Sequence, residues 1–241
     1  MIELHYTLEL HSPLRVGTGI GQAGYLDNSV MRNRRQQAIV PGSSIKGKSR
    51  AMVARLSHGL DLPLHPDRTT TGCSATTDPC ILCRLFGASH WPGGLHFADA
   101  ELHPDIQKVL NHLDDRAAND KRAVRNARNF GRHIRTSTAL DRRRRTVLRN
   151  RLFTHETVQL PVRFEGRISG HIHQMRPDGA EAVLLAAALE AITHLGGGRG
   201  RGTGRCRFTV AEIIFNGDSL AQTERATLLA ALIPVKEGSP S

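Results

Sequence analysis

Segments typical of strands lie at the start, in the middle and near the end of the chain. Residues 2–10 place apolar side chains at every second position, and residues 157–173 repeat this period of two, the pattern of a strand with one buried face. Residues 206–215 form a third predicted strand, and helices are predicted over residues 43–57 and 180–195. These elements together predict an α+β fold built around one sheet.

The complete order of predicted elements narrows the fold class. Weaker patterns predict one further strand and three helices, over residues 95–102, 103–116, 121–129 and 220–232. The order βαββαβ is that of a ferredoxin-like, or RRM-like, core. We expect a single domain over residues 1–241, with insertions at residues 58–94 and 121–156 that leave the sheet as functional loops do on a rigid scaffold.

The second insertion concentrates the positive charge of the chain. Residues 121–151 hold twelve basic residues and one acid, Asp141, and their net charge of +11 equals the formal net charge of the whole chain. Charge gathered in this way is the electrostatic footprint of a surface that binds phosphates. Aromatic residues make up only 4% of the chain, which disfavours binding based mainly on base stacking. We therefore expect phosphate and shape contacts with a nucleic acid.

A Pro-Gly-Ser-Ser segment at residues 41–44 precedes the first predicted helix, with Ser43 as its N-cap. The N–H groups and dipole at a helix N-terminus favour an anion. Ser43 and Ser44 add hydroxyl donors, and Lys46 and Arg50 add charge one turn further on. The spacing is not that of a Walker loop, and an ordinary capped helix with solvated lysines explains the segment equally well.

A glycine-rich loop at residues 196–204 follows the second predicted helix and contains Arg199 and Arg201. Six glycines in nine residues permit positive φ and a close approach of backbone to a ligand, and the two arginines suit phosphate. A disordered Arg-Gly linker is the alternative. We disfavour it because a predicted helix ends on one side of the loop and a predicted strand begins on the other.

Three cysteines lie within eleven residues of the first insertion, at Cys73, Cys80 and Cys83. A close cysteine pair with a third thiolate and a nearby imidazole fits tetrahedral zinc. His65 is the preferred fourth ligand, ahead of His58 and His90. Three free or buried cysteines without a metal remain the alternative.

The chain has no run of eighteen or more apolar residues, and its first residues carry charge where a signal peptide is apolar. We therefore expect a cytoplasmic protein without membrane contact, in which the cysteines do not form disulfides.

Three of these motifs together resemble one family. The Gly-Arg-Gly-x-Gly core of the glycine-rich loop resembles the signature of the RAMP superfamily of CRISPR proteins. Pro-Gly-Ser-Ser-Ile-Lys-Gly at residues 41–47 is similar to a segment of the backbone (palm) subunit of type III CRISPR-Cas effector complexes. Cys-Ile-Leu-Cys-Arg-Leu-Phe-Gly at residues 80–87 resembles the zinc-site segment of many such subunits. The resemblance runs in order from about residue 1 to residue 215.

The resemblance implies a function in RNA-guided RNA recognition. Family members assemble along a guide RNA with further copies of themselves and other effector subunits. Each inserts a thumb-like hairpin into the guide–target duplex. Here the thumb is expected over residues 132–152, with Leu140 or Val147 as its apolar wedge. Its phosphate-binding residues are then expected to be Arg132, Arg135, Arg142, Arg143, Arg144 and Arg145. A flexible loop that binds any polyanion is the alternative for the last four.

The resemblance also assigns a catalytic residue. A lone loop aspartate such as Asp27 is usually a turn or capping residue, and nothing local marks it as catalytic. In the family, an aspartate about fourteen residues before the Pro-Gly pair cuts the target RNA, and Pro41 lies fourteen positions after Asp27. Asp27 then acts as a general base or holds a catalytic Mg²⁺, while zinc is structural.

The sequence leaves two alternative functions open. Asn28-Ser29 replaces the family's Ser-Pro after the aspartate, which leaves a non-catalytic structural subunit with a partner nuclease. A guide-processing endoribonuclease of the same superfamily is the other alternative, although no histidine lies in the expected catalytic setting.

Overall fold

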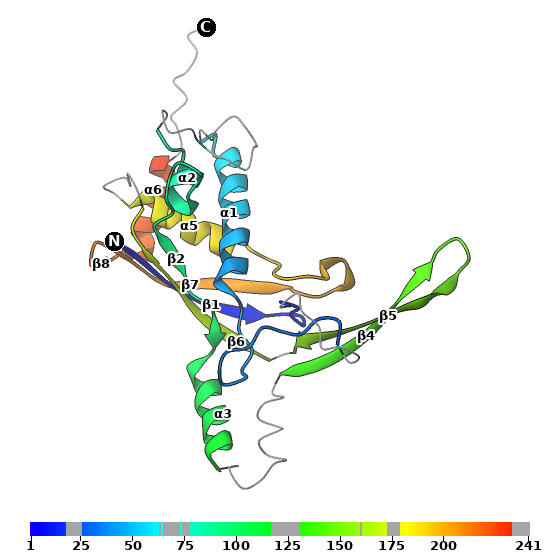
Figure 1. Ribbon diagram of the computed structural model, residues 1–241. Helices are drawn as coiled ribbons and strands as arrows, with labels where there is room; N and C mark the ends of the chain where they lie inside the picture. The colour runs from blue at the N-terminus through cyan, green and yellow to red at the C-terminus, as the bar shows by residue number, and fades with distance from the viewer. Residues whose placement is uncertain are drawn as a thin grey trace.

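The computed structural model describes residues 1–17, 26–62, 64, 73, 78–116, 131–159, 161–172 and 179–232. These residues form a mixed α+β body around an antiparallel sheet, and a two-stranded hairpin projects from that body (Figure 1). The predicted α+β class is confirmed.

The strand β1 (Ile2–Leu10) lies at the centre of the main sheet. It pairs antiparallel with β6 (Arg163–Gly170) on one side and with β7 (Cys206–Phe215) on the other. Three short strands extend the sheet, namely β2 (Leu95–Phe97) and β3 (Glu101–Leu102) beside β6, and β8 (Asp218–Ser219) beside β7. Burial alternates along β1 with a period of two, so one face of the sheet is closed by other elements, as the sequence predicts.

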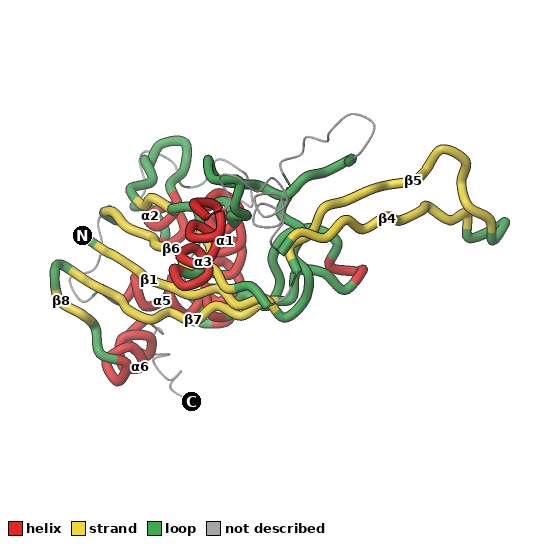
Figure 2. Tube along the Cα trace, turned by 90° about the horizontal axis from the view of Figure 1, so that it is seen from below, coloured by secondary structure: helices red, strands yellow, loops and turns green. Residues whose placement is uncertain are grey.

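Two helices cover the buried face. The helices α1 (Gly42–Gly59) and α5 (Ala180–Glu190) lie on the same side of the sheet (Figure 1), and they contact each other while α5 also contacts β7. Ile45 and Val53 of α1 are completely buried, as are the leucines of α5. The helix α3 (Pro104–Arg116) extends from the other side of the sheet (Figures 1 and 2).

Smaller helical segments complete the described chain, namely α2 (Ile81–Phe86), the 3-10 turn η2 (Arg199–Arg201) and α6 (Gln222–Leu232). Within the described ranges, no helix combines the length and apolar character needed to cross a membrane.

The hairpin consists of β4 (Arg132–Asp141) and β5 (Thr146–Val158), which pair with each other as a second, two-stranded sheet. Figure 2 shows it standing well clear of the body. Its tip is the turn at residues 142–145. Its base is joined to the body by backbone hydrogen bonds of 2.8 Å in both directions between Leu14 and Val158. The hairpin is therefore held only at its base.

The predicted strand over residues 157–173 is wrong in its first part. Thr157 and Val158 end β5, and β6 begins only at Arg163. Pro161 has no N–H with which to continue a ladder, so the strands separate there although the apolar alternation continues. Residues 160 and 173 lie outside the described residues, as does the helix predicted over residues 121–129.

Two other boundaries differ from prediction. The single strand expected over residues 95–102 is divided into β2 and β3, because Ala100 leaves β6 and exchanges backbone hydrogen bonds with Val40. The helix expected to reach residue 195 ends at Glu190. Beyond it, Thr193 and Leu195 bond to Cys206 and Gly204 through their backbones, so extended pairing buries Leu195 in place of a further helical turn.

The start of α1 also differs. The helix begins at Gly42 after Pro41, without a side-chain cap from Ser43. The N–H of Gly42 instead donates to Oδ1 of Asp99 (2.8 Å). A carboxylate from a distant segment thus replaces the predicted local cap.

Candidate nucleic-acid interface

Asp27 lies against the base of the hairpin. Its N–H donates to the carbonyl of Thr154 (2.9 Å), and the N–H of Thr154 donates back to Oδ2 of Asp27 (2.5 Å). One residue further on, Asn28 accepts a hydrogen bond from the N–H of Glu156 (3.0 Å). Asp27 itself is exposed. The loop therefore runs along the free edge of β5 and presents a carboxylate to solvent in a defined orientation.

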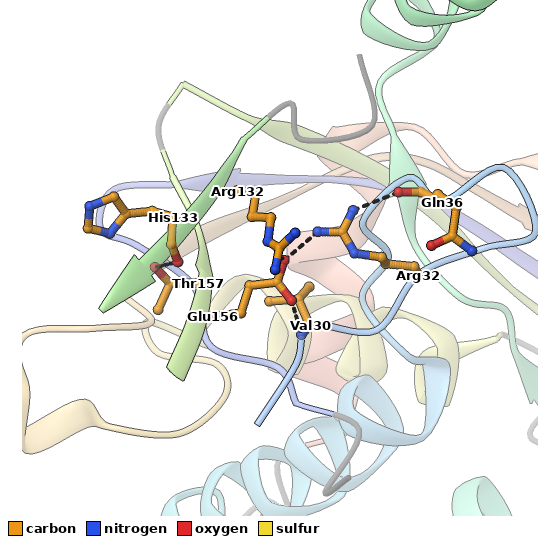
Figure 3. Close-up of polar contacts among 7 residues, drawn as sticks. All are labelled: Val30, Arg32, Gln36, Arg132, His133, Glu156 and Thr157. Atoms are coloured by element: carbon orange, nitrogen blue, oxygen red, sulfur yellow. Dashed lines mark hydrogen bonds and ion pairs between the residues drawn. The ribbon is translucent and has the colours of Figure 1, made fainter. Parts of the chain in front are cut away.

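The side chain of Glu156 fastens this loop to the hairpin (Figure 3). It is 3% exposed, and its Oε2 accepts the N–H of Val30 (3.0 Å). Its Oε1 pairs with Arg32 Nη2 (2.5 Å) and with Arg132 Nε (2.7 Å). A buried carboxylate is tolerated only when it is paired and hydrogen-bonded, and these partners come from both elements. Arg132, predicted to bind phosphate, is thus engaged in the structure of the hairpin base.

Sequence reasoning missed Glu156. Its local sequence resembles no motif, and its partners lie far away in the chain. The available signal is compositional, since Glu156 and Asp141 are the only acids between residues 131 and 159. An acid in such a basic segment is a candidate for an ion pair, as Glu156 forms, or for a bond to a turn, as Asp141 forms.

The glycine-rich loop packs on the segment that follows β1. The N–H of Gly197 donates to the carbonyl of Arg15 (2.9 Å), and that of Gly204 donates to Pro13 (2.9 Å). A Cβ at Gly196 would collide with the carbonyl oxygen of Arg15, so only glycine allows this approach. The loop is anchored at both ends, which contradicts the linker alternative.

The structure brings predicted basic residues into two separate cavities. Arg135 and Arg201 line one of about 250 Å³, beside Arg15 and His155, neither of which was predicted. Arg199 lines another of about 270 Å³ with side chains of α1 that include Lys48. The two arginines of the glycine-rich loop therefore serve different cavities.

The serines and basic residues predicted at the start of α1 do not gather in either of these cavities as the arginines above do. Ser43 is exposed, and Ser44 and Lys46 are half-buried. Arg50 donates from Nη1 to the carbonyl of Gly87 (3.3 Å). Because Asp99 already occupies the N–H of Gly42, an ordinary capped helix still explains this segment as well as an anion site does.

The outer part of the hairpin is exposed and basic. Arg142, Arg143, Arg144 and Arg145 form its turn, where Oδ1 of Asp141 accepts the N–H groups of Arg143 (2.9 Å) and Arg144 (3.2 Å). Large apolar side chains are exposed nearby, namely Leu140 (63%), Val147 (58%), Leu148 (43%) and Leu152 (61%). Exposed apolar groups rimmed by charge mark an interaction surface.

The three clustered cysteines come together in space. The sulfur atoms of Cys73, Cys80 and Cys83 all lie within 4.8 Å of one another. The N–H of Cys73 points at Sγ of Cys83 and that of Cys80 at Sγ of Cys73, both at 3.3 Å. Such a cluster can hold a metal ion such as zinc, since tetrahedral Zn–S bonds place sulfurs about 3.8 Å apart. His65, the predicted fourth ligand, lies outside the described residues.

Burial raises the pKa of the Cys83 thiol to about 12, and the neighbouring Cys80 adds to that rise. A metal binds the thiolate form and drives off the proton.

The chain was compared with known proteins both by sequence and by fold. A family model described as the RAMP superfamily matches residues 7–207. A chain of the cryo-EM structure of the type III-B Cmr-beta complex bound to cognate target RNA has a TM-score of 0.60 at 13% identity, covering 86% of this chain and 96% of that one. A chain of the apo state of Cmr-beta gives a TM-score of 0.56 at 13% identity, with coverage of 87% and 97%. At this identity the likeness is one of fold. No curated protein matches the sequence.

Proposed function

The chain belongs to the RAMP superfamily, and from this we propose that it is a backbone subunit of a type III CRISPR effector complex. In this role it binds guide RNA beside further copies of itself and other effector subunits, and it cleaves complementary target RNA through Asp27. The strand order β2–β6–β1–β7, with α1 and α5 on one face, would be the ferredoxin-like core, and the hairpin the thumb. The fold shared with chains of the Cmr-beta complexes supports this proposal.

The observation that carries the cleavage proposal is the bonding of Asp27 to the hairpin base. RNA supplies its own nucleophile, the 2′-OH, so a protein accelerates cleavage mainly by distorting the backbone for in-line attack. A projecting hairpin with exposed apolar groups is suited to that distortion, and the two hydrogen bonds with Thr154 hold Asp27 at its base. The carboxylate and the distorting element thus belong to one rigid unit.

Asp27 offers two kinds of chemistry. Its exposed carboxylate can take the proton of a 2′-OH as general base. It is also the hard oxygen ligand that Mg²⁺ prefers, and Mg²⁺ is commonly bound by one or two carboxylates together with substrate phosphates. When bound, Mg²⁺ would stabilise charge on the phosphoryl oxygens.

The assay that tests this function uses the chain assembled on a guide RNA, a complementary RNA and Mg²⁺. Each copy along the guide should cut once, so the expected products differ by a constant number of nucleotides. EDTA should suppress them if the metal takes part. A complementary RNA that stays intact would contradict the nuclease proposal.

We expect the arginines at the hairpin tip to bind RNA phosphates. Replacing Arg142, Arg143, Arg144 and Arg145 by alanine should weaken RNA binding. It should also reduce the slope of log affinity against log salt by about 0.7 for each phosphate of single-stranded RNA that the protein no longer neutralises. Fluorescence anisotropy at several salt concentrations measures both. Arg163→Ala with Arg167→Ala is the control, because these arginines pair with Glu9 and Glu3 on the sheet. An unchanged slope would place the RNA-binding surface elsewhere.

We also propose that the cysteine cluster holds a structural zinc ion. Cys83→Ser should lose one equivalent of zinc from the purified protein and lower its melting temperature, because a structural metal contributes directly to folding. Metal analysis and thermal unfolding measure these changes. Cys206→Ser removes a buried cysteine of β7 outside the cluster and should keep the metal. Folded wild-type protein without zinc would refute the site.

A non-catalytic structural subunit is the competing proposal, and one observation favours it. Oδ2 of Asp27 already accepts a hydrogen bond from the hairpin backbone, so the carboxylate has a structural role whether or not it cuts RNA. In that case a partner nuclease would cleave the target.

A further inference from the structure

The cavity of about 250 Å³ lies between the base of the hairpin and the glycine-rich loop. Its lining comes from the segment after β1, from both strands of the hairpin and from the glycine-rich loop, three regions that are far apart in sequence. These residues are Arg15, Arg135, Thr136, Ser137, His155, Thr157, Gly198, Arg201 and Thr203. At about 30 Å³ per water molecule, it has room for about eight waters. It is smaller than a typical drug-sized pocket of roughly 300–1,000 Å³ but large enough for a phosphate group and part of its sugar.

The lining is strongly cationic, and no acidic residue in it offsets the positive charge. It contains three arginines and a histidine but no acid, and none of the three guanidiniums forms an ion pair with a described acidic residue. Burial and the nearby Arg201 lower the pKa of Arg15. Positive charges held together in this way repel one another, and an anion between them would remove that repulsion.

The pKa of His155 is affected by the positive charge of the same cavity. Burial and then the charge of Arg15 lower its pKa, Arg201 acts in the same direction, and Asp27 opposes them. Its Nδ1 is buried without a hydrogen-bond partner among the described residues. A buried polar atom without a partner is unfavourable, and its place on a cavity wall makes this nitrogen accessible to a ligand or water.

The two faces of the hairpin base differ in how their arginines are paired. Successive side chains of a strand point to opposite faces, so His155 and Glu156 lie on opposite sides of β5. On the Glu156 side, the buried carboxylate pairs with Arg32 and Arg132. On the His155 side, Arg135 is directly opposite His155 in the ladder, and no such acid is present in the described lining. One face of the hairpin base thus holds a buried carboxylate that pairs with its arginines, whereas no residue of the described cavity lining does this for the arginines of the other face.

The cavity is also preorganised. The carbonyl of Arg15 accepts the N–H of Gly197 (2.9 Å), so backbone bonding holds in place the residue that supplies this guanidinium. Thr203 donates its hydroxyl to the carbonyl of Gly197 (2.8 Å), and Thr157 donates to that of His133 (3.3 Å). Their hydroxyl protons are therefore committed, and the remaining hydroxyl donors are Thr136 and Ser137. Fixing donors before binding reduces the entropic cost of association.

We propose that this cavity is a phosphate pocket that holds one backbone phosphate of an RNA strand at the foot of the hairpin, with Arg15 and His155 as members not identified from the sequence. The chemistry of the lining identifies the phosphate, since guanidinium groups match phosphate oxygens in bidentate geometry. That the phosphate belongs to RNA rests on the proposed function. Asp27 is bonded to Thr154, the residue before His155, so a phosphate in the pocket positions the strand beside the proposed cut.

The first test asks whether the pocket binds phosphate at all and needs no RNA. Inorganic phosphate is added to the full chain at constant ionic strength, with chloride as reference, and the imidazole of His155 is titrated by NMR. Phosphate should raise the pKa of His155, because an anion offsets the effect of Arg15 and Arg201. It should have no such effect in Arg15→Ala. An unchanged titration in the wild-type protein would overturn the pocket.

The second test asks whether the bound phosphate belongs to RNA. Arg15→Ala should weaken binding of a single-stranded guide RNA roughly 10- to 100-fold, as expected for a charged hydrogen bond removed from a buried setting, and lower the salt slope by about 0.7. Arg207→Ala removes an equal charge from an exposed position on β7 outside the pocket and should have a much smaller effect. Equal losses in the two folded variants would overturn the RNA assignment even where phosphate binds. Specific loss in Arg15→Ala without any target cleavage would leave the pocket intact and refute only the nuclease proposal.

Discussion

Asp27→Ala should reduce cleavage of complementary RNA by about 10²- to 10⁴-fold, the usual contribution of a general acid or base, while guide and target binding stay unchanged. The reason is geometric. Asp27 is an exposed carboxylate whose position is set by hydrogen bonds with Thr154 at the hairpin base, and RNA binding is assigned to basic side chains elsewhere. Single-turnover cleavage of a labelled target, together with anisotropy for binding, measures the two effects separately.

Two further variants separate chemistry from structure. Asp27→Asn keeps an oxygen that can accept the N–H of Thr154 but loses the charge, so it should fold as the wild type and still fail to cleave. Asp141→Asn changes the acid at the hairpin tip, which bonds to the turn, and should cleave normally. Full-rate cleavage by Asp27→Asn would show that the Asp27 carboxylate does not carry out cleavage and that the residue only holds the hairpin in place.

Glu156→Ala should lower the free energy of unfolding by about 3 kcal/mol, toward the lower end of the range for breaking a buried ion pair. The substitution removes the common partner of Arg32, Arg132 and the N–H of Val30. The effect falls at the lower end because the two arginine side chains are 18% and 26% exposed and can regain some hydration. Urea unfolding measures this change, and target cleavage should fall with it because the loop that carries Asp27 loses its fastening.

Glu9→Ala provides the matched control for this prediction. Glu9 pairs with Arg163 on the open face of the sheet, where the two side chains are 42% and 62% exposed, and exposed pairs contribute about 0–1 kcal/mol. Similar losses of stability in the two variants would mean that Glu156 does not fasten the loop to the hairpin.

The parts of the fold that were predicted correctly are those with a strong local signal. The period of two along β1 and the apolar run of α5 identify these elements without knowledge of their partners. Boundaries failed where a distant segment decided them. Pro161 separates β5 from β6 although the alternation continues, and the N–H of Gly42 takes Asp99 as its acceptor in place of Ser43.

The residues of the candidate site also separate into those that were predicted from the sequence and those that were missed. Arg201 and the cysteines were predicted as ligand-binding residues from residue type and spacing, and Arg135 from the family resemblance. Glu156 and Arg15 were missed because neither belongs to a motif. Both have neighbours that lie more than a hundred residues away in the chain, Arg32 for Glu156 and Arg201 for Arg15.

Which side chains this protein can use follows from its residues, since charge, sulfur chemistry and backbone freedom are properties of single residues. Which of these side chains meet follows from the folded arrangement of distant segments. It placed Asp27 on the edge of β5, paired Glu156 with two arginines on one face of the hairpin base, and gathered Arg15, Arg135 and Arg201 around the cavity that His155 lines on the other. The physical reason is that these groupings arise from strand pairing and burial between distant segments, and no local pattern encodes an interaction whose energy depends on both partners.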